Sequence, residues 1–310
     1  MKRKTAVLCL SALMVLPAVS AHLPKFHSGE DTVRIEDPGS PKITLSKLDG
    51  VRAHYYRMTL QSGETLYAGL YFPERNGELD LAVSGPGIES RGDPPEYLRD
   101  MPGETAVFRT RETDPLYEPF TPSAQFSGAA YRKKVEQAGT YYIAVFGESG
   151  SKYGLATGGE QRTPSAGWWT SPFFRVRTML WEGKSFFQIF WPALAVLAAG
   201  SSLIYRYGPE REKIPVLTGS LLYLSTAAVT SVQGMRALNA TGFHRNVLLT
   251  GGMVFFSSGL SFMLFRERKN LRPSRLVLYG VLGFIGWTGY IVGPLLVTGY
   301  GVFLWVQDRS

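Results

Sequence analysis

The chain has 310 residues, of which 45% are hydrophobic and 19% charged, and its formal net charge is +8. The charge is unevenly distributed, because residues 22–184 carry a net −2 while residues 185–310 carry +7. The basic residues lie beside apolar stretches and not around an aromatic-bearing groove, so nucleic acid is excluded as the expected partner.

The first 21 residues have the pattern of a secretory signal peptide. Three basic residues precede an apolar run over residues 6–16, and small residues in an A-x-A-like pattern end at Ala21. This arrangement predicts cleavage and export, not a membrane span. Cleavage after Ala21 makes His22 the first residue and removes Cys9, the only cysteine, so we expect no disulfide in the exported part.

Residues 22–157 are expected to form an extracytoplasmic β-sandwich. Short runs rich in Tyr, Val, Leu and Phe alternate with Gly, Pro, Asp and Ser, which is typical of antiparallel sandwiches. The predicted strands are 54–61, 64–72, 79–83, 106–110, 141–146 and 153–157. Ser62-Gly63 suggests a hairpin between the first two strands, and Ser127-Gly128 is interpreted as a turn.

The end of this region resembles the closing strands of the bacterial pre-peptidase C-terminal domain. The resemblance is carried by Ala-Gly-Thr-Tyr-Tyr-Ile-Ala-Val-Phe-Gly at 138–147, followed by Tyr-Gly-Leu at 153–155, and extends over about residues 43–158. It implies a small jelly-roll-like sandwich that serves as an accessory module without catalytic residues. The insertion between Pro86 and Phe126 departs from that compact pattern. The resemblance therefore implies binding, adhesion or support, and leaves the ligand open.

Three histidines suggest a metal site as an alternative function. A cleaved His22 would offer both an α-amine and an imidazole, and His27 and His54 could complete a nitrogen-rich set of the kind that Cu(II) prefers. This combination resembles periplasmic copper carriers and copper monooxygenases, which also begin with His on a β-sandwich. The competing interpretation is that His22 lies on an exported tail and His54 only flanks a strand.

Residues 158–184 are predicted to be a linker and membrane-interface segment, and residues 185–310 an all-α transmembrane bundle of four or five helices. The stretches 185–205, 214–235 and 246–265 each have the length of one crossing. The stretch 276–306 has 31 residues, which as one helix would reach ~46 Å, so it crosses once with excess length or is broken near Gly293-Pro294.

The basic residues between these stretches predict the orientation of the chain. The loops after the first and third stretch hold eight Lys or Arg, whereas the loop between them has only Arg236 and Arg245. Since Lys and Arg stay on the cytoplasmic side, residues 22–184 are expected outside a plasma membrane that the chain crosses several times.

The final stretch also carries small residues at every third position. Gly280, Gly283, Gly286 and Gly289 form a ridge that lets another helix approach closely, either inside the bundle or in a second copy.

The chain is therefore predicted to be a membrane-anchored protein with a binding or structural role in the cell envelope. It has no G-x-S-x-G, H-E-x-x-H or P-loop motif, so we expect it not to be an enzyme. The expected partners are the lipid bilayer and an envelope protein or glycan, and the only cofactor considered is copper. A small-molecule permease is a third hypothesis, although the spans hold no charged residue of the kind that lines ion routes.

Overall fold

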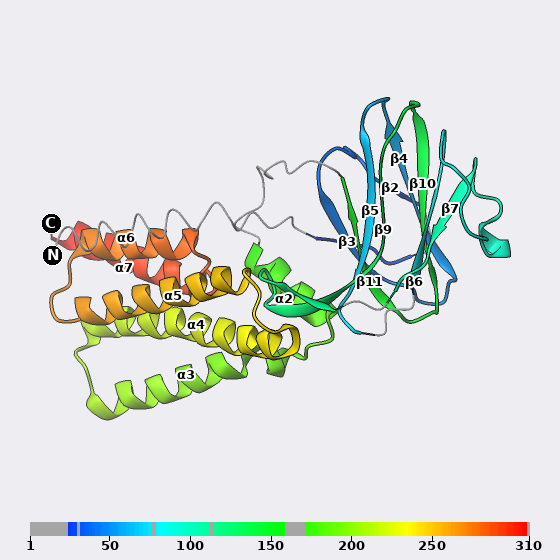
Figure 1. The fold of residues 1–310 in the computed structure, drawn as a ribbon. Helices are drawn as coiled ribbons and strands as arrows, with labels where there is room; N and C mark the ends of the chain where they lie inside the picture. The colour runs from blue at the N-terminus through cyan, green and yellow to red at the C-terminus, as the bar shows by residue number, and fades with distance from the viewer. Residues whose placement is uncertain (1–23, 30–31, 76–78, 112–113, 159–170, 309–310) are drawn as a thin grey trace.

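The computed structural model describes residues 24–29, 32–75, 79–111, 114–158 and 171–308. The predicted signal peptide and His22 lie outside these residues. The described chain forms a β-sandwich of two sheets followed by a group of helices, which confirms the predicted fold class (Figure 1).

The sandwich consists of a six-stranded sheet A and a five-stranded sheet B. In sheet order, sheet A contains β1 (Lys25–Phe26), β3 (Lys42–Lys47), β11 (Lys152–Thr157), β5 (Thr65–Phe72), β9 (Ser123–Lys134) and β8 (Pro115–Glu118). Sheet B contains β2 (Val33–Arg34), β4 (Ala53–Leu60), β10 (Gly139–Gly147), β6 (Leu79–Ser84) and β7 (Thr105–Phe108).

The strand order is that of a jelly roll. We leave aside the two-residue strands β1 and β2 and the short edge strand β8, and number the other strands one to eight along the chain. The sheets then read 1-8-3-6 and 2-7-4-5, with all neighbours antiparallel. The jelly-roll-like prediction is therefore confirmed by topology.

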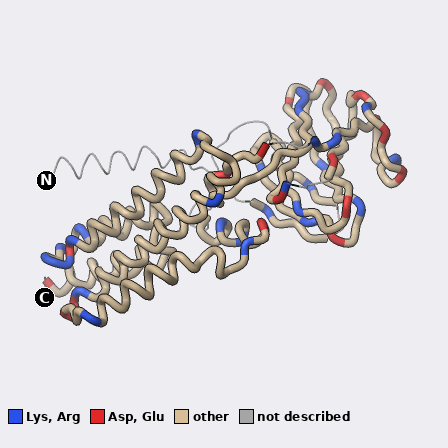
Figure 2. Tube along the Cα trace, turned by 60° about the horizontal axis from the view of Figure 1, so that its bottom comes forward, with Lys and Arg blue, Asp and Glu red and all other residues tan. Residues whose placement is uncertain are grey.

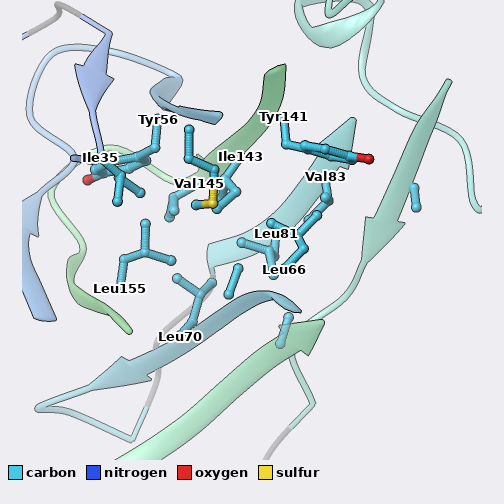
Figure 3. Packing of buried hydrophobic residues seen from close by; sticks show 14 of the residues in the cluster. Ile35, Tyr56, Leu66, Leu70, Leu81, Val83, Tyr141, Ile143, Val145 and Leu155 are labelled. Atoms are coloured by element: carbon cyan, nitrogen blue, oxygen red, sulfur yellow. The ribbon is translucent and has the colours of Figure 1, made fainter. Parts of the chain in front are cut away.

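The core of the sandwich lies between the inner faces of the two sheets (Figure 3). In β4 the buried Tyr56, Met58 and Leu60 alternate with the exposed Arg57 and Thr59, as the two-residue period of a strand requires. The inner face of sheet A supplies a matching row of apolar residues from β5 and β11, including Leu66, Leu70 and Leu155.

Two local predictions were wrong. Ser62-Gly63 does not form a hairpin, because β4 pairs with β10 in sheet B while β5 pairs with β11 in sheet A. The segment is instead a corner at which the chain changes sheets, and Gly63 has a φ of 89° there. Ser127-Gly128 is not a turn but lies in the middle of β9, where a Cβ on Gly128 would overlap the Phe72 side chain from the neighbouring strand.

Six α-helices follow the sandwich in the described part of the chain. They are α2 (Ser171–Trp181), α3 (Phe186–Tyr207), α4 (Ile214–Thr241), α5 (Val247–Glu267), α6 (Pro273–Ile285) and α7 (Val292–Gln307). Helix α2 lies within the segment predicted as linker. Helices α3, α4 (with the 3-10 turn Arg211–Lys213 before it) and α5 are long and apolar enough to cross a membrane.

The final apolar stretch is two helices, α6 and α7, joined by a turn over residues 286–291. The break comes slightly earlier than the predicted Gly293-Pro294, and Pro294 lies in the first turn of α7, where a missing N–H costs no helical hydrogen bond. At 13 and 16 residues, both helices are shorter than a full crossing by a straight helix.

The four glycines of the predicted ridge pack inside the bundle. A Cβ on Gly280 would overlap Thr298 of α7, and one on Gly283 would overlap Tyr223 of α4. Gly286 and Gly289 approach Phe256 and Tyr223 in the same way. The helices that these glycines admit closely are therefore those of the same chain.

The sandwich lies at one end of the helices (Figure 1). Figure 2 shows that Lys and Arg gather at the opposite end, while the middle of the helices carries almost no charge. We call these the sandwich end and the far end of the bundle.

Candidate functional site

Two of the three predicted metal ligands come together in the structure. His27 follows β1, whose parallel pairing with β3 continues through a hydrogen bond from His27 N to Leu45 O at 2.9 Å. His54 lies on β4 of the other sheet, and the ring centroids of His27 and His54 are 5.3 Å apart. His22 lies outside the described residues, among which no group of three His, Cys, Asp or Glu could hold a metal ion.

His54 belongs to a buried polar cluster at this edge of the sandwich. Its Nδ1 is 2.8 Å from Tyr153 Oη, which is in turn 2.7 Å from Tyr56 Oη. Burial, together with the nearby His27, lowers the pKa of His54 to about 4. His54 is therefore a neutral imidazole at pH 7, with Nδ1 already engaged in a hydrogen bond.

The His27 imidazole is less well satisfied than that of His54. Its Nε2 is buried and has no hydrogen-bond partner among the described residues. Two imidazoles are fewer than the three protein ligands of a typical catalytic metal site, so a metal here would need a further ligand such as the predicted His22.

Beside this cluster, helix α2 attaches to sheet A at the edge formed by β1 and β3. Trp181 Nε1 donates a hydrogen bond to Ser46 O at 3.2 Å, and the Arg177 guanidinium lies 3.9 Å from the centroid of the Phe26 ring. The Tyr71 ring packs directly against Gly154, and a Cβ added to Gly154 would overlap that ring. The sequence did not reveal α2, although Ser171-Pro172 is a recognisable helix start.

Glu182, directly after α2, joins the helix to the β8–β9 hairpin. Its Oε1 accepts hydrogen bonds from Thr121 Oγ1 at 2.7 Å and Ser123 Oγ at 2.8 Å. Its Oε2 pairs with Lys184 Nζ at 2.9 Å, and the Glu182 side chain is nearly fully buried. The ion pair and the two hydroxyl hydrogen bonds compensate this buried charge, although Oε2 makes no hydrogen bond of normal geometry among the described residues.

The same hairpin reaches the helices at their sandwich end (Figure 1). Tyr117 Oη donates a hydrogen bond to Thr250 Oγ1 of α5 at 2.9 Å, and both residues are buried. Phe120 contacts Trp287 of the α6–α7 turn, with ring centroids 6.4 Å apart. The sandwich is thus held to the bundle by contacts between residues more than a hundred positions apart, which no local pattern could reveal.

Glu118, also on this hairpin, has a strongly perturbed carboxyl group. Burial raises its pKa to about 6, a hydrogen bond from Phe120 N at 2.8 Å partly opposes the rise, and Glu182 adds to it. Perturbed groups concentrate at functional sites and at structural junctions alike.

The part of the insertion that precedes β7, residues 87–104, covers the outer face of sheet B, whereas the later part forms the β8–β9 hairpin that reaches the helices (Figure 1). The short helix η2 (Glu96–Leu98) buries Leu98 against that face, while Tyr97 remains 37% exposed. The guanidinium of Arg52 lies 5.8 Å from the Tyr97 ring centroid, and Tyr55 Oη donates a hydrogen bond to Tyr97 O at 3.2 Å.

We call Arg52, Tyr55, Tyr97 and Arg109 the distal patch. Arg109 lies beside the other members, 5.6 Å from the centroid of the Phe146 ring on which Tyr97 also packs, and it pairs with Asp80. The patch combines fixed aromatic and guanidinium groups, which are the side chains enriched at protein interfaces.

The sequence matches no protein-family model and no curated protein. Among solved structures, the pre-peptidase C-terminal domain of collagenase from Bacillus anthracis aligns over 42% of this chain and 97% of its own, with 14% identity and a TM-score of 0.26.

The periplasmic inhibitor of g-type lysozyme PliG from Salmonella Typhimurium aligns over 38% of this chain and 98% of its own, with 17% identity and a TM-score of 0.17. A mutant of the PliG of Escherichia coli aligns over 41% of this chain and 98% of its own, with 13% identity and a TM-score of 0.15. Similarity this low carries no functional information, and the description of the fold rests on the strand order above.

Proposed function

We propose that this chain is a membrane-anchored protein of the cell envelope whose β-sandwich has a binding role outside the cytoplasm and performs no catalysis of its own. The apolar helices α3, α4 and α5 support the anchor. The resemblance of residues 43–158 to an accessory sandwich supports binding over chemistry.

The orientation in this proposal rests on the loop charges at the far end of the bundle (Figure 2). The basic residues of the two loops there are Arg206, Arg211, Lys213, Arg266, Arg268, Lys269, Arg272 and Arg275. A cytoplasmic far end agrees with the positive-inside rule and with an exported sandwich.

The observation that carries the binding role is the direction of the distal patch. Helix α2 contacts sheet A at strand β3, and the β8–β9 hairpin at the other edge of the same sheet contacts the helices, so the sandwich is fixed to the bundle through sheet A. The distal patch lies on the outer face of sheet B. Figure 1 shows that sheet B is the sheet farther from the helices. A rigid aromatic and arginine surface held away from the membrane is suited to meeting another envelope component.

Photocrosslinking in cells of the source organism tests this role. A photoreactive amino acid is placed at Tyr97, and a matched control carries it at Glu136, an exposed residue elsewhere on the sandwich. The proposal predicts discrete crosslinked species from position 97 that are absent from position 136 and diminish when Arg52→Ala is added. Identical adduct patterns at both positions, or none at either, would contradict a partner at the distal patch.

Copper binding is a second candidate function, and it is favoured by the proximity of His27 and His54. The neutral His54 imidazole needs no deprotonation before it can ligate a metal, and His27 Nε2 lacks a competing hydrogen bond among the described residues. The experiment is a Cu(II) titration of the purified chain followed by spin resonance, with His27→Ala as the test variant and His244→Ala as the control. One tightly held Cu(II) with several nitrogen ligands, lost only in His27→Ala, would support this function, whereas absence of stoichiometric binding would exclude it.

A further inference from the structure

Arg175 is a cation at the sandwich end of the bundle with few partners. Helix α2 directs it toward α4, where its Nη2 donates a hydrogen bond to Thr230 Oγ1 at 3.3 Å. Its Nε is buried without a partner, and no carboxylate lies within ion-pair distance of it among the described residues. A guanidinium has five N–H donors, so most of its hydrogen-bonding capacity is unused in the contacts that the structure describes.

The environment of Arg175 is costly for a positive charge. Burial lowers the pKa of Arg175, and the nearby Tyr290, Tyr117 and Glu182 only partly oppose this effect. Glu182 is itself occupied by Lys184 and by the hydroxyls of the β8–β9 hairpin. A buried charge that the protein leaves without a counter-ion is a candidate for a functional role.

The α6–α7 turn adds three more unsatisfied donors. Trp287 Nε1 and Thr288 Oγ1 are buried without a hydrogen-bond partner in the described chain. Tyr290 Oη is also buried, and it lies beside the hydroxyls of Ser225 and Thr226 without making a hydrogen bond of normal geometry to either. Trp287, Tyr290 and Ile291 also have positive φ angles of 51°, 56° and 68°. Non-glycine residues adopt this conformation only when the surroundings enforce it, and such strain clusters at ligand-binding sites.

Arg175 and this turn meet on one face of α4. Thr230 contacts Arg175, and Thr226, one helical turn earlier, accepts a hydrogen bond from Gly289 N at 2.9 Å. The two contacts are therefore separated by only about 6 Å along α4. Tyr290 connects them, because it lies near Thr226 and interacts electrostatically with Arg175.

We infer that Arg175, Trp287, Thr288 and Tyr290 form a binding site for an anionic phosphate group at the sandwich end of the bundle, and we call these residues the donor cluster. Every member can donate a hydrogen bond and none has its full set of partners, so an acceptor is what the site lacks. A phosphate supplies several acceptor oxygens and the counter-charge for the guanidinium.

The surroundings favour a lipid headgroup as the source of the phosphate. Phe173, two residues before Arg175 on α2, is 64% exposed, and Phe187 at the start of α3 is 69% exposed. The start of α3 lies beside Gln233, three residues after Thr230 on α4, so both apolar side chains face outward near the donor cluster. Such residues suit the boundary between headgroups and acyl chains. The phosphate of an anionic lipid in the leaflet on the sandwich side would lie at this depth, although a free phosphate from solution has the same chemistry.

The test uses the full chain in nanodiscs of phosphatidylcholine, with or without phosphatidylglycerol, and separately with inorganic phosphate added to the neutral discs. Thermal unfolding is followed by tryptophan fluorescence, and bound lipid is counted by native mass spectrometry. Arg175→Gln removes the central cation. Arg177→Gln is the matched control, because it removes an equal charge from the same helix but from a residue that stacks on Phe26.

Phosphatidylglycerol is expected to raise the Tm of the wild type and of Arg177→Gln, but not that of Arg175→Gln. The amount of anionic lipid bound to Arg175→Gln should fall by about tenfold or more, because charged hydrogen bonds are lost. In neutral discs Arg175→Gln should be at least as stable as the wild type, because a buried charge without a counter-ion has been removed. If inorganic phosphate alone reproduces the rise in Tm, in an Arg175-dependent manner, the same site binds a soluble anion.

The inference would be overturned if Arg175→Gln and the wild type respond equally to both additives, or if both arginine variants lose the response equally. A structural role for Arg175 would instead lower the Tm of Arg175→Gln in every lipid. Trp287→Phe, which removes one donor and keeps an aromatic ring, provides a second test. It should weaken lipid retention while the fold remains intact, and unchanged retention would contradict the site.

Discussion

The hydrogen bond between Tyr117 and Thr250 allows a sharp test of how the sandwich is held on the bundle. It joins Tyr117 Oη on β8 to Thr250 Oγ1 on α5 at 2.9 Å, across 133 positions of sequence. Both residues are buried, so neither hydroxyl can readily exchange this partner for water. Tyr117→Phe removes the donor and leaves Thr250 without its tyrosine partner.

The expected cost follows from the burial of this pair. Removing one partner of a buried hydrogen bond costs about 1–3 kcal/mol, because the remaining polar group stays desolvated. Replacing both partners, in Tyr117→Phe with Thr250→Val, should cost less than the sum of the single changes. We expect a coupling of about 0.5–1.5 kcal/mol between the two positions.

The assay is thermal unfolding of the wild type, both single variants and the double variant in the same nanodiscs. In a chain of this size a change of 1 kcal/mol lowers Tm by about 2–4 °C. Tyr55→Phe, which removes a hydrogen bond at the exposed distal patch, is the control and should have a much smaller effect. Strictly additive effects of Tyr117→Phe and Thr250→Val would refute this attachment of the sandwich.

Two further predictions concern packing and pH. Gly280→Ala should destabilise the chain by about 1–3 kcal/mol, because the added Cβ would overlap Thr298. Gly251→Ala is the control, since it has open space around it and should be neutral or stabilising. Equal Tm values for the two variants would contradict the close packing of α6 on α7. The pKa of His54 is lowered to about 4 in the fold, so its stabilising effect is complete above pH 6.5 and is lost as the pH falls toward 4. Between these limits the wild type should lose up to about 3 kcal/mol relative to His54→Gln, and parallel curves of Tm against pH would contradict this.

The strands that the sequence predicted are those rich in large aliphatic and aromatic residues. β4, β5, β6, β7, β10 and β11 all coincide with predicted runs, because their inward residues form the core between the sheets. β9 escaped prediction because it has few large apolar residues and Ser127-Gly128 was interpreted as a turn. The structural reason for Gly128 is the Phe72 side chain of a strand more than fifty residues away. Local propensity cannot reveal such a partner.

The candidate sites, too, could be predicted only in part from the sequence. His27 and His54 were selected by residue type, and the structure brings them together through the pairing of β1 with β3. Arg175 was not selected, because Arg175 and Arg177 look alike in sequence. Two residues apart on a helix, they must point in nearly opposite directions, and only the docking of α2 determines which one is buried.

The most direct test of the account is the sidedness of the two ends of the bundle. With Cys9 replaced by Ser, a single cysteine is introduced at Glu148 in the sandwich or at Asn270 in the loop between α5 and α6, both of which are exposed. Intact cells are treated with a membrane-impermeant maleimide before and after permeabilisation. The account predicts that position 148 is labelled in intact cells and position 270 only after permeabilisation. Labelling of both positions in intact cells, or of position 270 alone, would contradict a sandwich that lies outside the membrane on helices that cross it.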